Sequence, residues 1–216
     1  MSRLVLHNYF RSSTSYRVRI ALNLKGLDYD YVAHHLRHGE HHDPAFLAVN
    51  PQGLVPALIW EDGSMIAQSL AICEFLDETV PEPPLLPADA LGRARVRMLA
   101  QMIACDIHPL NNLRVLSTLR SRYGADDAEI ADWFRNWVNE GFQPLEKILA
   151  KSSDTGTFCH GEQPGLADIC LVAQVANNAR FNVDMTPYPT ISRIRDACME
   201  IAAFADAAPA RQPDAE

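Results

Sequence analysis

Near the start of the chain, an arginine and a run of hydroxyl residues are the side chains best suited to chemistry. Arg11 is followed by Ser12, Ser13, Thr14 and Ser15. Hydroxyl residues cap helices by accepting a hydrogen bond from the first free backbone N–H groups. Because such N–H groups favour an anion, the run predicts a site for a thiolate, a carboxylate or a phosphate. An ordinary helix cap without a ligand is the alternative interpretation.

The residues around this run predict the elements that hold it. Val18, Ala21 and Leu22 recur at helical spacing, and Gly26 is suited to the left-handed turn just past a helix end. The apolar run Leu4–Leu6 reads as a buried strand. A strand therefore leads into a helix whose open end carries the hydroxyls.

A second hydroxyl-bearing helix start follows further along the chain. Gln68 and Ser69 precede a helical apolar pattern in residues 70–76, after a hairpin signal in residues 61–64. The complete order over the first 80 residues is strand, helix, strand, short helix, strand, strand and helix. The expected strands and short helix span residues 4–6, 29–33, 43–49, 54–60 and 65–67, with Pro56 at the start of its strand. This βαβαββα order is the thioredoxin-like arrangement.

The second half of the chain is predicted to be all-helical, so the fold class is α/β plus all-α. A stiff proline-rich linker at 81–87 separates a domain at 1–80 from a helical bundle at 88–216. We expect a long first helix that begins after Asp89 and is interrupted near Pro109. The later helices are expected at 125–149, 166–178 and 191–204, with residues 208–216 as a loose tail.

Composition limits the possible functions. The net charge of −8, without a basic cluster, argues against binding to nucleic acid or to an anionic membrane surface. No apolar run approaches the roughly 18 residues of a membrane span, and polar residues directly follow residues 1–6, so no secretory signal is expected. Five widely spaced cysteines without a C-x-x-C pair suggest reduced thiols. The cytoplasm is the expected location.

Histidines are concentrated in the segment HHLRHGEHH at residues 34–42. Their spacing matches no metal-site pattern, and no thiolate lies nearby in the sequence. We therefore predict a polar loop in which one histidine contacts a ligand, and no metal site.

Six segments together resemble the zeta-class glutathione transferases, whose bacterial members are maleylacetoacetate and maleylpyruvate isomerases. The segments are RSSTSYRVRIALNLKG at 11–26, NPQGLVPAL at 50–58, the Gln68-Ser69 pair, the linker at 81–87, IHPLNNLRVL at 107–116 and ARFNVDMTPYP at 179–189. They follow in the family's order from Leu4 to about Ala207. The resemblance implies the glutathione transferase fold, glutathione as cofactor and a homodimer.

The resemblance also implies roles for individual residues. Ser12 would hydrogen-bond the sulfur of glutathione, and Val55, before a cis Pro56, would pair its backbone with the tripeptide. The other implied glutathione contacts are Gln68 and Ser69 at the γ-glutamyl carboxylate, His41 and Gln52 near the glycyl end, and His108 and Asn112 at glutathione or substrate. The cationic positions around the substrate are Arg11, Arg114 and Arg180.

Two residues depart from the family pattern. Gly165 stands where a helix commonly opens with Thr or Ser, which should cost a few tenths of a kcal/mol. Thr14 stands where many members have Cys, which argues against dithiol chemistry and for an enzyme that uses the thiol of its ligand. Ser12 is the predicted thiol-activating residue, with Thr14 as the alternative donor and Arg11 as a further catalytic candidate.

The reaction that the resemblance implies is reversible addition of the glutathione thiolate to the cis double bond of a maleyl keto acid, followed by rotation and elimination. We expect conversion of maleylacetoacetate to fumarylacetoacetate in aromatic amino acid catabolism. The alternatives are a maleylpyruvate isomerase of gentisate catabolism and a general zeta-class transferase or dehalogenase. A binding module without chemistry would have lost the thiol-activating and γ-glutamyl-binding residues, which are present here.

Overall fold

The computed structural model describes residues 3–216, which form two compact units. The first unit runs to Leu85 and also includes Glu200–Glu216, and the second unit is Leu86–Met199. The sequence-based division assigned all residues from 88 to 216 to the helical domain. The last part of the chain instead belongs to the first unit.

The first unit is built on a four-stranded sheet with the strand order β2-β1-β3-β4. Its strands are β1 Leu4–Asn8, β2 Tyr29–Ala33, β3 Ala57–Ile59 and β4 Met65–Ala67. Strand β2 pairs with β1 in parallel, whereas β1 with β3 and β3 with β4 are antiparallel. Strand β3 is shorter than predicted because Pro56, directly before it, has no N–H to contribute to the ladder.

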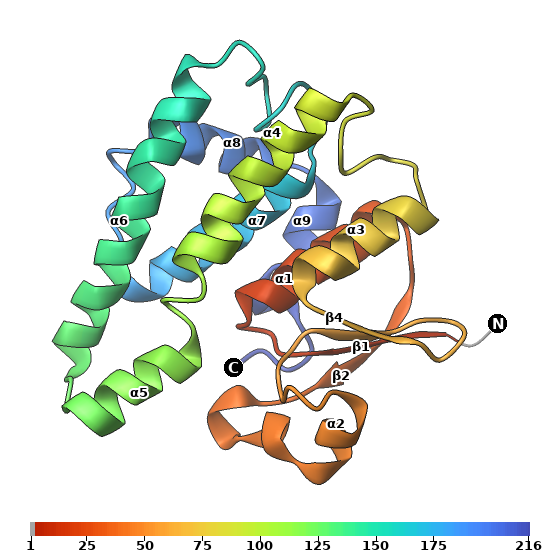
Figure 1. Cartoon of the computed structure of the whole chain (residues 1–216), viewed down its shortest axis with the longest axis vertical. Helices are drawn as coiled ribbons and strands as arrows, with labels where there is room; N and C mark the ends of the chain where they lie inside the picture. The colour runs from red at the N-terminus through yellow and green to blue at the C-terminus, as the bar shows by residue number, and fades with distance from the viewer. Residues whose placement is uncertain (1–2) are drawn as a thin grey trace. The chain divides into compact units, whose positions relative to one another are not determined.

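The sheet carries helices on both faces. Figure 1 shows α1 (Ser13–Leu24) and α3 (Ser69–Thr79) next to each other on one side of the sheet and the short α2 (Pro44–Val49) on the other. Short 3-10 helices at Leu36–His38 and Glu40–His42 precede α2. Together with the sheet, these helices form the predicted thioredoxin-like domain.

The C-terminal segment of this unit is ordered, contrary to the expected loose tail. It forms α9 (Ala202–Asp206) and a 3-10 turn at Pro209–Arg211. The buried Arg19 guanidinium on α1 donates to Ala207 O at 3.0 Å and to Phe10 O at 3.1 Å. Further on, the Asp214 carboxylate accepts from the Phe10 N–H at 3.1 Å and from the Tyr31 hydroxyl. The tail is therefore tied to the loop between β1 and α1.

The second unit is helical. Its helices are α4 Ala90–Gln101, α5 Leu113–Tyr123, α6 Asp127–Lys151, α7 Leu166–Asn178 and α8 Pro189–Met199, with a 3-10 turn at Ala179–Phe181. Figure 1 shows α4 beside α7. The predicted last helix at 191–204 is two helices, because α8 ends at Met199 and α9 lies in the first unit.

The predicted interruption of the first long helix has an unexpected form. A π-helical segment at Met102–Ile107 follows α4 and ends just before His108 and Pro109. It packs closely on α6, where Gly141 leaves room for it. A Cβ atom at Gly141 would lie 2.4 Å from Ile107 Cδ1, so only glycine fits there without rearrangement.

A buried aspartate binds the backbone of the glycine at the start of α7. The Asp168 carboxylate accepts from the N–H of Gly165 at 2.9 Å and from the N–H of Cys159 at 2.8 Å. Burial raises the pKa of Asp168, while these two hydrogen bonds oppose that rise. Asp168 thus makes one bond of a capping box, the one to the N-cap N–H, while glycine offers no side chain for the other bond.

Within residues 3–216, no helix is both long enough and apolar enough to cross a membrane.

Candidate functional site

The N-terminus of α1 brings two of the predicted hydroxyls together. Ser12 is the N-cap residue, and its Oγ accepts from the Ser15 N–H at 3.2 Å. Ser12 Oγ lies 2.8 Å from Thr14 Oγ1, and the Thr14 hydroxyl donates to Val55 O at 3.1 Å. Because the Thr14 proton is given to Val55, Thr14 accepts in its bond with Ser12. In the ligand-free protein the Ser12 hydroxyl therefore donates to Thr14. Unlike the Thr14 proton, the Ser12 proton is not held by a backbone carbonyl group, so it can rotate to a ligand.

Val55 lies beside these hydroxyls at the end of a structured turn. The turn is closed by Asn50 Nδ2, which donates to Leu54 O at 2.8 Å, and by Gly53 at φ +59°. The Val55-Pro56 peptide bond is cis, as the resemblance implies. Among residues 3–216, the Val55 N–H has no backbone acceptor. It is free to pair with an extended peptide.

The start of α3 brings Gln52 and Gln68 together. Gln68 precedes the helix with φ +71° and ψ 114°, a conformation that non-glycine residues rarely adopt. Its Nε2 donates to Gln52 Oε1 at 3.1 Å. Ser69 is the first residue of α3 and is buried. This end of the helix combines free N–H groups with a hydroxyl and two amides, a set that suits a carboxylate.

Arg11 already lies against an acidic side chain. Its Nη2 is 3.4 Å from Glu216 Oε2, and the Nε2 atom of His35 is 2.8 Å from Glu216 Oε1. The hydrogen bond from His35, with the charges of His35 and Arg11, lowers the pKa of Glu216. Arg11 is therefore positioned so that it can hold a carboxylate.

The histidines of residues 34–42 make close ring contacts, and several are partly buried. The rings of His35 and His38 lie 3.7 Å apart, and those of His41 and His42 lie 3.9 Å apart. His41 Nδ1 is buried without a hydrogen-bond partner. In the described part of the chain, no three His, Cys, Asp or Glu side chains are grouped so that they could hold a metal ion.

The pair of His7 and His34 is expected to weaken the protein in acid. Its ring nitrogens lie 2.9 Å apart, and the His34 ring also packs on Phe46 at 4.1 Å. Burial lowers the pKa of both histidines from the ordinary 6.5. The unfolded chain therefore binds protons first as the pH falls, so their contribution to stability is full above about pH 6.5 and is lost progressively below it.

Thermal unfolding measured between pH 8 and pH 5, in steps of about half a unit, tests whether stability falls as the pH is lowered. The variant His34→Phe keeps an aromatic ring against Phe46 and removes one of the two titrating histidines, so its Tm should fall less steeply in acid than that of the unchanged chain. Equal slopes would contradict the assignment.

The remaining predicted residues belong to the second unit. His108 and Asn112 lie at the end of the π-helical segment and the start of α5, with Asn112 Nδ2 3.4 Å from His108 Nε2. The Asn112 Oδ1 atom caps α5 by accepting from the Arg114 N–H at 3.2 Å. The exposed Arg180 donates to Asn177 Oδ1 at 3.0 Å and packs on the Phe181 ring.

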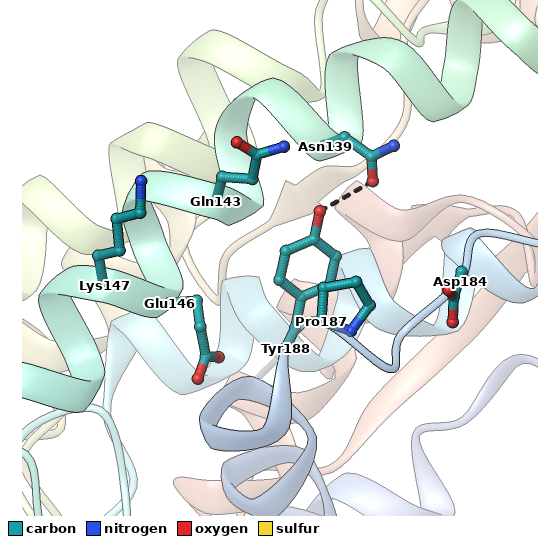
Figure 2. A pocket seen from close by; sticks show the side chains of 7 residues that line it. All are labelled: Asn139, Gln143, Glu146, Lys147, Asp184, Pro187 and Tyr188. Carbon is teal, nitrogen blue, oxygen red and sulfur yellow. Dashed lines mark hydrogen bonds between the residues drawn. The ribbon is translucent and has the colours of Figure 1, made fainter.

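A cavity of about 350 Å³ in the second unit contains none of the predicted site residues. Figure 2 shows side chains of α6 on one wall and the segment before α8 on the other. The Tyr188 hydroxyl donates to Asn139 Oδ1 at 2.9 Å. The Glu146 carboxylate accepts from the N–H groups of Thr190 and Ile191 at 2.9 Å. These hydrogen bonds join α6 to the start of α8, so the polar side chains around the cavity have a structural role.

Two buried arginines of α1 were not identified as candidates from the sequence. Arg17 and Arg19 are 1% and 0% exposed. Arginines on helices are mostly exposed, so their residue type gave no reason to expect burial. The close spacing of two arginines among apolar residues of this helix was the available signal.

The comparisons with known proteins first give the class. The family described as "Glutathione S-transferase, N-terminal domain" matches residues 11–79. This match covers the sheet from β2 onward and the two helix starts described above. The chain has the glutathione transferase fold, a thioredoxin-like domain followed by a helical region.

Full-length relatives then give the family. A maleylpyruvate isomerase of a Ralstonia species is 52% identical over 97% of this chain and 98% of its own length. A probable maleylacetoacetate isomerase of Vibrio cholerae is 48% identical over 100% of both chains. The chain therefore belongs to the zeta class of glutathione transferases, in the family of glutathione-dependent maleylacetoacetate and maleylpyruvate isomerases.

Solved structures agree with this family. The holo structure of a bacterial zeta-class maleylpyruvate isomerase superposes with a TM-score of 0.96 at 51% identity, over 98% of this chain and 100% of the other. A maleylacetoacetate isomerase of Methylobacterium extorquens with bound malonate and glutathione gives a TM-score of 0.95 at 43% identity, over 98% and 99%.

Proposed function

We propose that the protein isomerises a maleyl keto acid from cis to trans with glutathione as cofactor, and that maleylpyruvate is the preferred substrate. The observation that carries the chemistry is the Ser12 hydroxyl at the N-terminus of α1, whose proton is given to Thr14 without ligand and can rotate to a bound sulfur. The 52% identity to a maleylpyruvate isomerase favours this substrate. Maleylacetoacetate is the second candidate, because relatives with that assigned substrate reach 48% identity.

The first unit supplies most of the proposed glutathione contacts. Val55 offers a free N–H, next to the Thr14 hydroxyl that fixes its carbonyl group. Gln68 and Ser69 would bind the γ-glutamyl carboxylate at the start of α3. The remaining contacts carried over from the family are His41 and Gln52 at the glycyl end, with His108 and Asn112 of the second unit at glutathione or substrate.

Glutathione supplies the nucleophilic thiol when it is bound, and the role of the chain is to keep that thiol ionised. An ordinary thiol has a pKa of about 8.5, and a helix terminus lowers it by less than one unit, since one unit needs about 1.36 kcal/mol. A hydrogen bond from Ser12 to a charged sulfur, about 1.5 to 3 kcal/mol, lowers it by one to two units more. Ser12 is therefore the main activating residue.

Three arginines are the proposed partners of the anionic substrate. A guanidinium group can hold a carboxylate through two parallel hydrogen bonds. Arg11 adjoins Ser12 and already contacts a carboxylate, that of Glu216. Arg114 and Arg180 are carried over from the family. Fixed cations at these positions would also stabilise the enolate charge that develops during addition.

Replacement of Arg180 by alanine is expected to raise KM for the dianionic keto acid about ten-fold or more, because a charged hydrogen-bonding pair is lost. The conjugation of glutathione to a neutral electrophile should change less than two-fold by the same substitution, since no carboxylate is involved. Steady-state kinetics with both substrates measures the difference. Equal losses for the two substrates would rule out a carboxylate clamp. The exposed Arg122 on α5 provides a control substitution.

The test of the proposed function is kcat/KM for maleylpyruvate and for maleylacetoacetate, each with and without glutathione. We expect turnover only with glutathione and a preference for maleylpyruvate. A preference for maleylacetoacetate would assign the second substrate. Failure to isomerise either compound, with retained conjugation of an α-halo acid, would replace the proposal with a detoxifying transferase.

The proposed enzyme acts in the cytoplasm as a homodimer. Five cysteines without a disulfide bond are compatible with a reducing compartment. Sedimentation of the purified chain at several concentrations measures the oligomeric state.

A further inference from the structure

Arg17 is a buried cation without a counter-ion. It lies on α1 and is 1% exposed. Its Nη1 atom donates to Ser69 Oγ at 3.3 Å, while Nε and Nη2 have no hydrogen-bond partner. No carboxylate among residues 3–216 forms an ion pair with it. A buried guanidinium in this state is costly to the folded protein unless something else neutralises it.

The neighbouring Arg19 is a buried arginine whose side-chain nitrogens all have hydrogen-bond acceptors. Arg19 is 0% exposed, yet Nε donates to Ala207 O at 3.0 Å, Nη1 to Asn8 Oδ1 at 3.0 Å and Nη2 to Phe10 O at 3.1 Å. Each nitrogen of Arg19 has an acceptor. The two unpartnered nitrogens of Arg17 are therefore a specific feature of that position.

Among residues 3–216, the hydrogen bond of Arg17 is made at the start of α3. Ser69, its acceptor, is the first residue of this eleven-residue helix and is itself 5% exposed. A serine oxygen that accepts from a guanidinium still has its own proton to donate. Because the donor is charged, the hydroxyl is polarised and its proton is turned away from Arg17. The next acceptor in this hydrogen-bond chain must be a group outside Arg17, and an anion suits it best.

We propose that Arg17 is a positioning residue that acts through Ser69 and supplies the positive charge for the α-carboxylate of the γ-glutamyl group of glutathione. This inference rests on the proposed function, in which Gln68 and Ser69 bind that carboxylate. This carboxylate would bind the free N–H groups at the start of α3 and the Ser69 hydroxyl. The buried guanidinium would stabilise its charge through Ser69. The cost of burying Arg17 without a partner is offset when this anion binds.

The test compares two ligands that differ in one carboxylate. Glutathione carries the α-carboxylate, whereas 4-aminobutyryl-cysteinylglycine lacks it and keeps the rest of the tripeptide. Dissociation constants are measured by calorimetry for the unchanged chain, for Arg17→Met and for Arg17→Lys. We expect Arg17→Met to weaken glutathione binding about ten-fold or more and to change binding of the analogue less than two-fold. Arg17→Lys keeps the charge and should recover most of the affinity.

Kinetics and stability give independent readouts. In Arg17→Met, KM for glutathione should rise while kcat at saturating glutathione changes less than two-fold, because the thiol-activating residue is unchanged. Removal of an unpartnered buried charge should also raise the Tm of the ligand-free protein. If Arg17→Met does not fold, Arg17→Gln replaces it in the same measurements.

Three results would overturn the inference. Equal losses for glutathione and the analogue would make Arg17 a purely structural residue. Unchanged glutathione binding in both Arg17→Met and Arg17→Gln would show that its charge is not used. If the unchanged chain binds glutathione and the analogue equally well, the carboxylate has no site at α3. The third result would contradict the role of Arg17 but not the proposed glutathione-dependent isomerisation. If the protein did not bind glutathione at all, both the role of Arg17 and the proposed function would be wrong.

Discussion

Replacement of Ser12 by alanine is expected to lower kcat/KM at neutral pH by about ten- to one-hundred-fold, because a charged hydrogen bond of about 1.5 to 3 kcal/mol is lost. The pKa of bound glutathione should rise by one to two units, since this bond stabilises only the thiolate. Difference ultraviolet absorbance of the thiolate, titrated against pH, measures that shift in the complex.

The natural control is Thr14→Val. Thr14 donates to Val55 O and accepts from Ser12, so in the ligand-free protein it orients the Ser12 proton and has no proton of its own to give to a sulfur. Its replacement should leave the pKa of bound glutathione within about half a unit of its original value, since the Ser12 donor remains. If Thr14→Val raises that pKa and Ser12→Ala does not, the roles of the two hydroxyls must be exchanged.

Ser12→Ala also removes a helix cap, and this effect must be separated from chemistry. Ser12 Oγ accepts from the Ser15 N–H, and loss of such a cap costs about 1 kcal/mol. Ser12→Gly retains more of the capping preference than alanine does and also lacks the hydroxyl. The two variants should therefore differ in stability and show the same loss of thiolate.

Replacement of Asp77 by alanine is expected to destabilise the first unit by about 3 to 5 kcal/mol, because the buried Lys25 ammonium is left without its counter-ion. Lys25 Nζ lies 2.8 Å from Asp77 Oδ1, with side-chain exposures of 0% and 10%. The same ammonium donates to Pro83 O at 2.6 Å, and Asp77 Oδ1 accepts from the Leu85 N–H at 2.7 Å. The pair therefore also fastens residues 83–85 to α1 and α3.

A surface ion pair of equal length provides a matched control. Arg3 Nη1 lies 2.8 Å from Asp30 Oδ1, but the two side chains are 63% and 49% exposed. Asp30→Ala should cost less than about 1 kcal/mol because water screens an exposed pair. Urea denaturation measures the free energy of unfolding of both variants.

The double variant Lys25→Met/Asp77→Leu should recover much of the lost stability, since it leaves no buried charge. Equal costs for Asp77→Ala and Asp30→Ala would contradict this account.

Local patterns in the sequence were sufficient for most of the secondary structure. The start of α1 at Ser12, the start of α4 after Asp89 and the turn before Val55 follow from side chains that bond to their own neighbouring backbone. Such interactions span a few residues, so they are visible in the sequence. The resemblance then named the family, which the full-length relatives confirm.

The sequence pattern did not reveal where the C-terminal segment packs. Residues 200–216 have helical and turn signals, but these do not say which unit will cover them. Their position depends on Arg19, which binds Ala207 O, and on Asp214, which binds the Phe10 N–H. These contacts join residues about two hundred positions apart, so only the folded chain brings the partners together.

The sequence by itself therefore determined the family, the order of the elements and the hydroxyl-bearing ends of α1 and α3. The tertiary structure decided which protons and charges are available at those ends. In the described part of the chain, Thr14 gives its proton to Val55, each nitrogen of Arg19 has an acceptor and Arg17 has Ser69 as its one hydrogen-bond partner. The physical reason is that burial and hydrogen-bond partners depend on side chains from several elements, whereas residue type and spacing describe one element at a time.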